Sequence, residues 1–188
     1  MGNQLYHHAW GGDLSEVGEP YLQGQVSYGK SQILLRDYNS RGEVNAVLLE
    51  MCEDVARRSR ENYQAGRTIS LGIGYSKNAF GGGFQRSRTI NEATYDTMEI
   101  YKVCMVLLNE NYDHQAVRQI SISITKLEDE HSMQLSLFET KKWQVRKLGT
   151  VMDDIRTRYG STAILRAVSL TDAGRGIKRS KLVGGHRG

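Results

Sequence analysis

Two stretches in which apolar and small polar residues strictly alternate constrain this chain more than any other feature. They span residues 67–77 and 117–127. A period of two places the apolar side chains on one face of a strand and the small residues on the other. Both segments are therefore predicted to be strands with one buried face, whose residues are Ile69, Leu71, Ile73, Ile120, Ile122 and Ile124.

The rest of the main domain supplies two more strands and two helices. Residues 26–38 and 84–90 are strand-like, and Gly81-Gly82-Gly83 marks a hairpin turn before the second of them. Apolar residues recur at helical spacing in 42–62 and 95–112. The order βαββαβ predicts an α+β fold of the split βαβ type, a four-stranded antiparallel sheet with two helices on one face and the other face open.

The chain of 188 residues has room for one sizeable core and a small appendage. We expect a short helix and linker over 1–24, the main domain over 25–128, a connecting segment over 129–142, and a C-terminal helix with a basic tail over 143–188. The helix, over 143–159, carries an apolar stripe formed by Val145, Leu148, Met152 and Ile155, and its pattern does not show how it packs on the domain.

Several features indicate a cytoplasmic protein. No apolar run approaches the ~20 residues of a membrane span, and the first residues lack the regions of a secretory signal. Cys52 and Cys104 lie within apolar helical patterns, which predicts buried thiols in a reducing compartment. No membrane partner is expected.

Charge is distributed unevenly along the chain. Residues 1–140 hold 13 Lys and Arg against 18 Asp and Glu, a net charge of −5, whereas residues 141–188 hold 12 against 3, a net charge of +9. A basic segment favours a polyanion such as nucleic acid, because each neutralised phosphate releases counterions. For a basic terminus alone, a tail that only keeps the chain soluble is the commoner explanation.

The open face of the predicted sheet has the composition of a phosphate-binding surface. Hydroxyls, glycines and a rim of cations fix a protein on a duplex backbone without reading base sequence. The alternative is an ordinary solvated face, and no aromatic residues lie mid-strand to stack on single-stranded bases. The candidate DNA-binding residues are Lys30, Arg67, Thr68, Ser70, Gly72, Ser76, Lys77, Arg86, Arg88, Arg118, Ser121, Ser123 and Thr125.

A glutamine, Gln134, is followed by the large apolar residues Leu137 and Phe138 in an otherwise hydrophilic segment. The whole motif consists of Gln134, Leu135, Ser136, Leu137 and Phe138. Such a peptide can drop its Leu and Phe into a partner's pockets, each buried side chain contributing about 1.5–3 kcal/mol. The alternative is an edge strand that packs Leu135 and Leu137 on its own core.

No pattern in the sequence indicates an enzyme active site. Asp153 and Asp154 are neighbours on a helix and point about 100° apart, so they are expected to be salt-bridged or solvated. His7-His8 lacks further ligands at metal spacing, the glycine runs complete no nucleotide-binding loop, and no residues form a nucleophile triad. We therefore expect no catalytic residue, metal or cofactor in this chain.

Five features together resemble the C-terminal part of the Y-family translesion DNA polymerases, in their UmuC-like branch from Gram-positive bacteria. They are the fold order, the segments 67–77 and 82–90, Gln134–Phe138, and the ending 179–186. Residues from about 25 to 127 look like that family's little finger, and 5–14 is similar to the end of its thumb. The palm, which holds the family's metal-binding carboxylates and Mg²⁺, has no counterpart here.

The resemblance implies two partners. The sheet would grip the template-primer duplex, and Gln134–Phe138 would bind the bacterial sliding clamp, in a DNA damage bypass protein associated with the nucleoid. A stand-alone adaptor that binds the clamp but not DNA is the alternative.

Overall fold

The alternating segments form the predicted sheet. The structure is a computed structural model that describes residues 6–7, 9–12, 27–77, 82–130 and 140–180. Its strands β1 (Ser27–Tyr38), β2 (Gln64–Tyr75), β3 (Gly83–Thr94) and β4 (Val117–Asp129) pair antiparallel in the order β1-β4-β2-β3. β1 and β2 are parallel to each other with β4 between them, and β3 and β4 are parallel with β2 between them. The predicted α+β fold of split βαβ type is confirmed.

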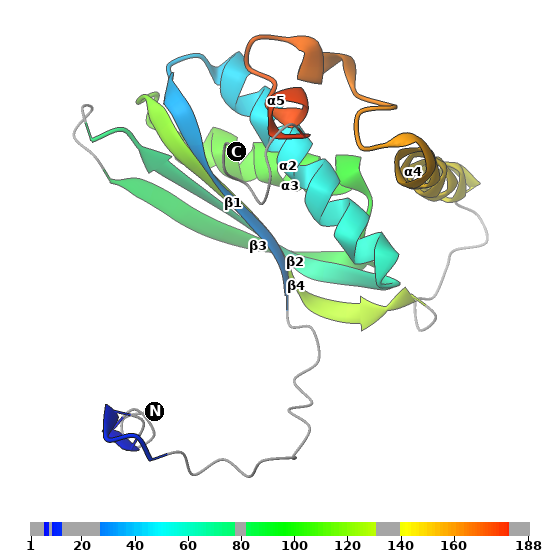
Figure 1. Cartoon of the computed structure of the whole chain (residues 1–188), viewed down its shortest axis with the longest axis horizontal. Coiled ribbons are helices and arrows are strands. Elements are labelled where there is room, and N and C mark those ends of the chain that lie inside the picture. Colours follow the sequence, from blue (N-terminus) through cyan, green and yellow to red (C-terminus); the bar gives the residue numbers. More distant parts are fainter. Residues whose placement is uncertain (1–5, 8, 13–26, 78–81, 131–139, 181–188) are drawn as a thin grey trace.

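Two long helices, α2 (Arg41–Glu61) and α3 (Thr97–Asn111), cover one face of the sheet (Figure 1). A capping box begins α2: the Ser40 hydroxyl accepts a hydrogen bond from the Gly42 amide, and Glu43 accepts one from the Ser40 amide. Asp96 begins α3 by accepting a bond of 2.8 Å from the amide of Glu99. Both helices lie within one or two residues of the predicted ranges.

The core fills the space between this helix layer and the sheet. Ile69, Leu71, Ile120 and Ile124 are fully buried from the sheet side, as the alternation predicts. Cys52 and Cys104 are buried free thiols, and burial raises the pKa of the Cys52 thiol well above its usual range. The prediction of two buried thiols is confirmed.

Residues 140–180 form a C-terminal arm that packs on the helix layer. The arm contains α4 (Thr140–Tyr159), the short 3₁₀ helix η2 (Ala167–Leu170) and α5 (Gly176–Ser180). Figure 1 shows η2 and α5 above α2, and α4 at one end of the helix layer. The Tyr38 hydroxyl reaches the arm by donating to the Ala173 carbonyl at 3.1 Å. The arm thus extends the fold by a further layer beyond α2.

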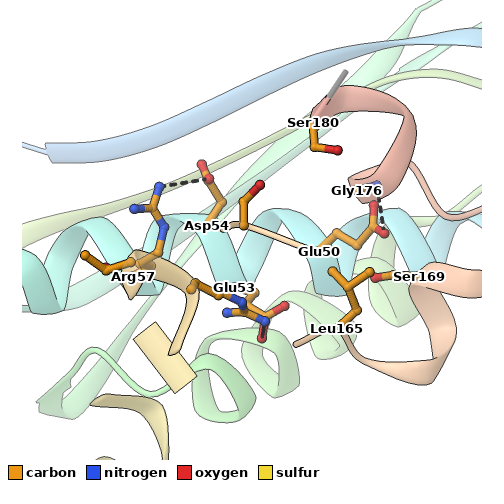
Figure 2. Close-up of a pocket in the computed structure, with 11 residues that line it drawn as sticks. Glu50, Glu53, Asp54, Arg57, Leu165, Ser169, Gly176 and Ser180 are labelled. Atoms are coloured by element: carbon orange, nitrogen blue, oxygen red, sulfur yellow. Dashed lines mark hydrogen bonds and ion pairs between the residues drawn. The ribbon is translucent and has the colours of Figure 1, made fainter. Parts of the chain in front are cut away.

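Acidic side chains of α2 hold this arm. The buried Glu50 carboxylate accepts bonds from the amides of Arg175, at 2.9 Å, and Gly176, at 3.1 Å, in a polar hollow between α2 and the arm (Figure 2). Glu53 binds Arg156 at 3.1 Å and Arg166 at 3.2 Å. The charged groups around this hollow are largely neutralised by one another.

The sequence does not specify how α4 packs, and the structure supplies this. Asp153, Arg156 and Gly149 lie against the domain, whereas Val145 and Leu148 of the apolar stripe are 42% and 59% exposed. Met152 and Ile155 are half-buried. Ion pairs rather than apolar packing therefore determine how this helix sits. Asp153 is salt-bridged to Arg60 and Asp154 is exposed, so each takes one of the two roles expected for the pair.

Candidate nucleic-acid interface

The outer face, meaning the side of the sheet opposite α2 and α3, carries the small residues of the alternating strands. Residues directly opposite one another in an antiparallel pair share a face. Ser70 lies between Ser123 and Ser87, and Gly72 lies between Ser121 and Gln85. Thr68 and Thr125 continue the same row. The structure therefore brings together six of the predicted residues: Thr68, Ser70, Gly72, Ser121, Ser123 and Thr125.

The centre of the outer face is a shallow hollow of about 290 Å³. Gly29 and Ser31 of β1, Ser121 and Ser123 of β4, and Gly72 of β2 line it. A Cβ at Gly72 would stand 2.4 Å from the Ser121 hydroxyl oxygen, so glycine keeps this part of the hollow open. Hydroxyls and exposed backbone here can approach a flat, hydrogen-bonding surface closely.

A second hollow of about 740 Å³ lies on the same face at the ends of β1 and β2. Ile33 and Leu35 border it and are 68% and 61% exposed, beside Lys77, Gln119 and Arg118. The sequence analysis did not predict that these two β1 residues face outward. Ile33 pairs with Gln119, which pairs with Gly74, so the sheet register is the signal that places Ile33 there.

Three of the cations predicted for this surface are on the other side of the sheet. Lys30 is opposite Ile122 and forms an ion pair of 2.8 Å with Asp54 of α2. Arg88 is opposite buried Ile69 and binds Glu110 of α3 at 2.9 Å. Arg86 is opposite buried Leu71, which places it on the helix side as well. The prediction that these residues form part of an outer cationic rim is wrong, because strand parity directs them toward the helices.

Ser76 also differs from its predicted position. It follows the last residue of β2, is buried at 3% exposure, and donates to the Asp37 carboxylate at 2.7 Å. The alternation that predicted an outward hydroxyl ends because the Ser76 amide bonds the Ala116 carbonyl at 2.8 Å, outside the regular ladder. This residue fixes the strand end and offers no free hydroxyl to a ligand.

Three predicted cations lie at the margins of the outer face. Lys77 is exposed, and Arg118, 44% exposed by its side chain, is 3.5 Å from Asp37. Arg67 binds Glu128, and this pairing raises the pKa of the Arg67 guanidinium. The outer face is thus less electropositive than the sequence predicted, and its charge is concentrated near Lys77 and Arg118.

The predicted clamp-binding residues, Gln134 to Phe138, lie outside the described part of the chain. Among the residues that the structure describes, no three His, Cys, Asp or Glu side chains gather as metal ligands. None of the described helices is both long and apolar enough to cross a membrane.

Comparison with known proteins assigns the family. Residues 25–137 match the model of the impB/mucB/samB family C-terminal domain. The chain belongs to this family and contains the C-terminal little finger domain of a Y-family DNA polymerase. The resemblance stated from the sequence is therefore confirmed.

Curated relatives share this region. The chain is 58% identical over 187 residues, all of its length, to the "Putative UV-damage repair protein UvrX" of Bacillus subtilis, and covers 45% of that protein. It is 63% identical over 112 residues to the "DNA repair protein homolog YobH" of the same organism, covering 60% of this chain and 52% of that one. "DNA polymerase IV 2" of B. subtilis is 36% identical over 186 residues, 98% of this chain and 45% of the relative.

The chain therefore spans about half the length of these relatives. Among solved structures, a chain of the "Complex of beta-clamp processivity factor and little finger domain of PolIV" aligns with 60% of this chain and 98% of its own length. The TM-score is 0.45 and the identity is 12%.

Proposed function

We propose that this chain is the DNA-binding and clamp-binding C-terminal region of a translesion DNA polymerase, and that its outer face holds the template-primer backbone without reading base sequence. The uncovered row of hydroxyls and glycines over β4 and β2 is the observation that carries the proposal. Polar groups on such a row can bond phosphate oxygens while the missing side chains let the duplex approach. Membership of a polymerase family supports this ligand over other polyanions.

In this proposal the chain itself carries out no nucleotidyl transfer. Its residues would position DNA, and the parent protein's palm would supply the Mg²⁺ and carboxylates for chemistry. Gln134–Phe138 would add a second attachment, which raises the local concentration of the polymerase at a stalled clamp.

Salt dependence tests the DNA site. With two or three phosphates neutralised, affinity for a duplex measured by fluorescence anisotropy should fall about 10- to 40-fold between 50 and 200 mM salt. The fall should be similar for duplexes of unrelated sequence. Affinity that stays constant with salt would refute the backbone site.

A single substitution tests the location of the site. Ser123→Glu places a carboxylate at the centre of the outer face, and should weaken duplex binding by tenfold or more at 100 mM salt. The matched control is Thr150→Glu, which makes the same charge change at an exposed position on α4. Equal DNA affinity of the two variants would show that the outer face is not the site.

The clamp attachment is tested separately. Leu137→Ala combined with Phe138→Ala removes both apolar anchors, and should abolish binding to a bacterial sliding clamp while leaving duplex affinity unchanged. If the double variant binds the clamp as the wild type does, the motif assignment fails.

The turning of Lys30, Arg86 and Arg88 toward the helix side favours a second candidate, a stand-alone adaptor that binds the clamp but not DNA. In that case the wild-type chain binds the clamp and shows no measurable duplex binding even at 50 mM salt. Duplex affinity and clamp affinity of the wild-type chain, measured on one preparation, decide between these two functions.

A further inference from the structure

Helix α4 attaches to its own domain through its polar side. Arg60 of α2 donates from Nε to Asp153 at 2.7 Å and from Nη1 to the Tyr95 carbonyl at 2.9 Å. A Cβ added at Gly149 would stand 3.4 Å from the Arg60 guanidinium, and the Arg146 guanidinium stands 5.3 Å from the centre of the Tyr95 ring. The side of the helix formed by residues 146, 149, 153 and 156 is therefore occupied.

Part of the apolar side of the same helix is exposed. Val145, Leu148 and Val151 are 42%, 59% and 44% exposed, while Met152 and Ile155 on the same side are half-buried. The three exposed residues lie within about 120° of one another around the helix, so they form one apolar stripe. A lone exposed apolar residue needs no explanation, but a stripe on a helix that is anchored by buried ion pairs indicates a docking surface.

We propose that this stripe, Val145, Leu148 and Val151, is a second contact for the sliding clamp, next to the groove that takes Gln134–Phe138. This inference rests on the proposed function. Only Glu139 separates Phe138 from Thr140, the first residue of α4. With about 3.5 Å per extended residue and 1.5 Å per helical residue, the Leu148 backbone lies within about 20 Å of Phe138. A protein that holds Phe138 in a groove has its neighbouring surface within reach of the stripe.

The charges around the stripe define the chemistry of that neighbouring surface. Exposed Lys147 and Arg158 outnumber the exposed carboxylate near them on α4, Asp154, whereas Glu53 and Asp153 lie on the docked side and are paired. The fitting partner surface is apolar with acidic residues at its edge. Duplex DNA fits less well, because its charged, hydrated phosphates cannot bury three exposed aliphatic side chains.

Clamp binding by the full chain tests the inference, with immobilised B. subtilis sliding clamp and biolayer interferometry as the readout. Leu148→Glu should weaken clamp binding by about tenfold or more, since burial of one leucine contributes that much affinity. Leu148→Ala should weaken it by a smaller factor. Thr150→Glu, with the same charge change on the same helix, should stay within about twofold of the wild type. Duplex affinity should be the same in all of them.

The outcomes separate this inference from the proposed function. If Leu148→Glu and Thr150→Glu bind the clamp equally well, the stripe is not a clamp contact, while loss of binding in the Leu137→Ala, Phe138→Ala variant still supports the motif. If the wild-type chain does not bind the clamp, the proposed function itself fails. The stripe could instead be covered by a second copy of this chain, which sedimentation of the wild type and of each variant tests. A wild-type dimer that Leu148→Glu dissociates would assign the stripe to that second copy and overturn the inference.

Discussion

At the scale of single residues, the arm's attachment centres on the Arg60–Asp153 pair. Both side chains are about nine-tenths buried, at 9% and 11% exposure. Removing one partner of such a pair leaves an uncompensated buried charge, at a cost of about 3–5 kcal/mol. The pair Arg57–Glu61, on the exposed side of the same helix, is a natural comparison because its side chains are 36% and 44% exposed.

We expect Arg60→Met to undock α4 from the helix layer. The cost above corresponds to hydrogen exchange of the α4 amides that is at least about 100-fold faster than in the wild type. Arg57→Met, which removes only a surface ion pair worth about 0–1 kcal/mol, should leave the exchange of α4 unchanged. Equal protection of α4 in both variants would show that the buried pair does not hold the helix.

Tyr95 gives the domain a defined sensitivity to alkali. Its hydroxyl is buried and donates to the Glu130 carboxylate, and burial together with this bond raises the pKa of Tyr95 to about 12. The unfolded chain has a tyrosine pKa near 10.0 and releases the proton earlier. The stabilisation is therefore complete below pH 10 and is lost as the pH rises toward 12.

We expect Tyr95→Phe to remove this part of the pH dependence. Between pH 10 and 12 the wild-type free energy of unfolding should fall by about 2 kcal/mol more than that of the variant, which is most of the loss that a two-unit pKa difference produces. Urea unfolding at several pH values measures the difference. Parallel losses in the two proteins would assign the alkaline sensitivity to other groups.

At the scale of secondary-structure elements, the β2–β3 hairpin depends on two adjacent glycines with different surroundings. Gly82 has a φ of +84°, and a Cβ added there would meet no other atom within 4 Å. Gly83 has a φ of +148°, and a Cβ there would stand 2.1 Å from the Ile73 carbonyl oxygen. Only the second glycine is needed for the close approach of the two strands.

We expect Gly82→Ala to cost about 1–2 kcal/mol of unfolding free energy, the usual penalty for a positive φ in a residue with a side chain. Gly83→Ala should cost more than twice as much, because the backbones of β2 and β3 must also separate. Thermal unfolding of the two variants measures both. Equal destabilisation would show that the ends of β2 and β3 can move apart at little cost in free energy.

The elements predicted from sequence are those whose signal is local. Alternation predicted β2 and β4 because one face of each is buried, and helical spacing predicted α2 and α3. The faces of Arg86 and Arg88 were missed because the parity of β3 follows from the register of the hairpin, which the sequence of the turn does not specify. Ile33 was missed for the same kind of reason, since its face follows from pairing with Gln119.

The orientation of α4 could not be predicted from its own pattern. An apolar stripe shows which side of a helix seeks burial, but Arg60 lies 93 residues before Asp153 and nothing near α4 in the sequence reveals it as the partner. Likewise, the small-residue row of the outer face was predictable, and the destinations of its surrounding cations were not. Lys30 and Arg88, like Asp153, pair with charged groups that are distant in the sequence.

At the scale of the whole molecule, opposite charges hold the arm to the rest of the chain. The basic arm meets the acidic side of α2 through Glu53, and its own Asp153 meets Arg60; the two carboxylate side chains are 13% and 11% exposed. Salt shortens the screening length from about 10 Å at 0.1 M to about 3 Å at 1 M, but buried pairs are screened far less than exposed ones.

We therefore expect the arm to stay docked at 1 M salt, where the proposed duplex binding would be lost. Hydrogen exchange of α4 should change by less than about threefold between 0.1 and 1 M salt. Release of α4 at high salt would show that solvent reaches these pairs, and would make arm docking and DNA binding respond to salt together.

Because β4 ends at Asp129 and α4 is attached through Arg60, the elements before and after residues 131–139 both belong to the same domain. Nine residues reach at most about 30 Å when fully stretched. If a partner binds Leu137 and Phe138 as proposed, the peptide both enters and leaves its groove, so that groove has to be open at both ends.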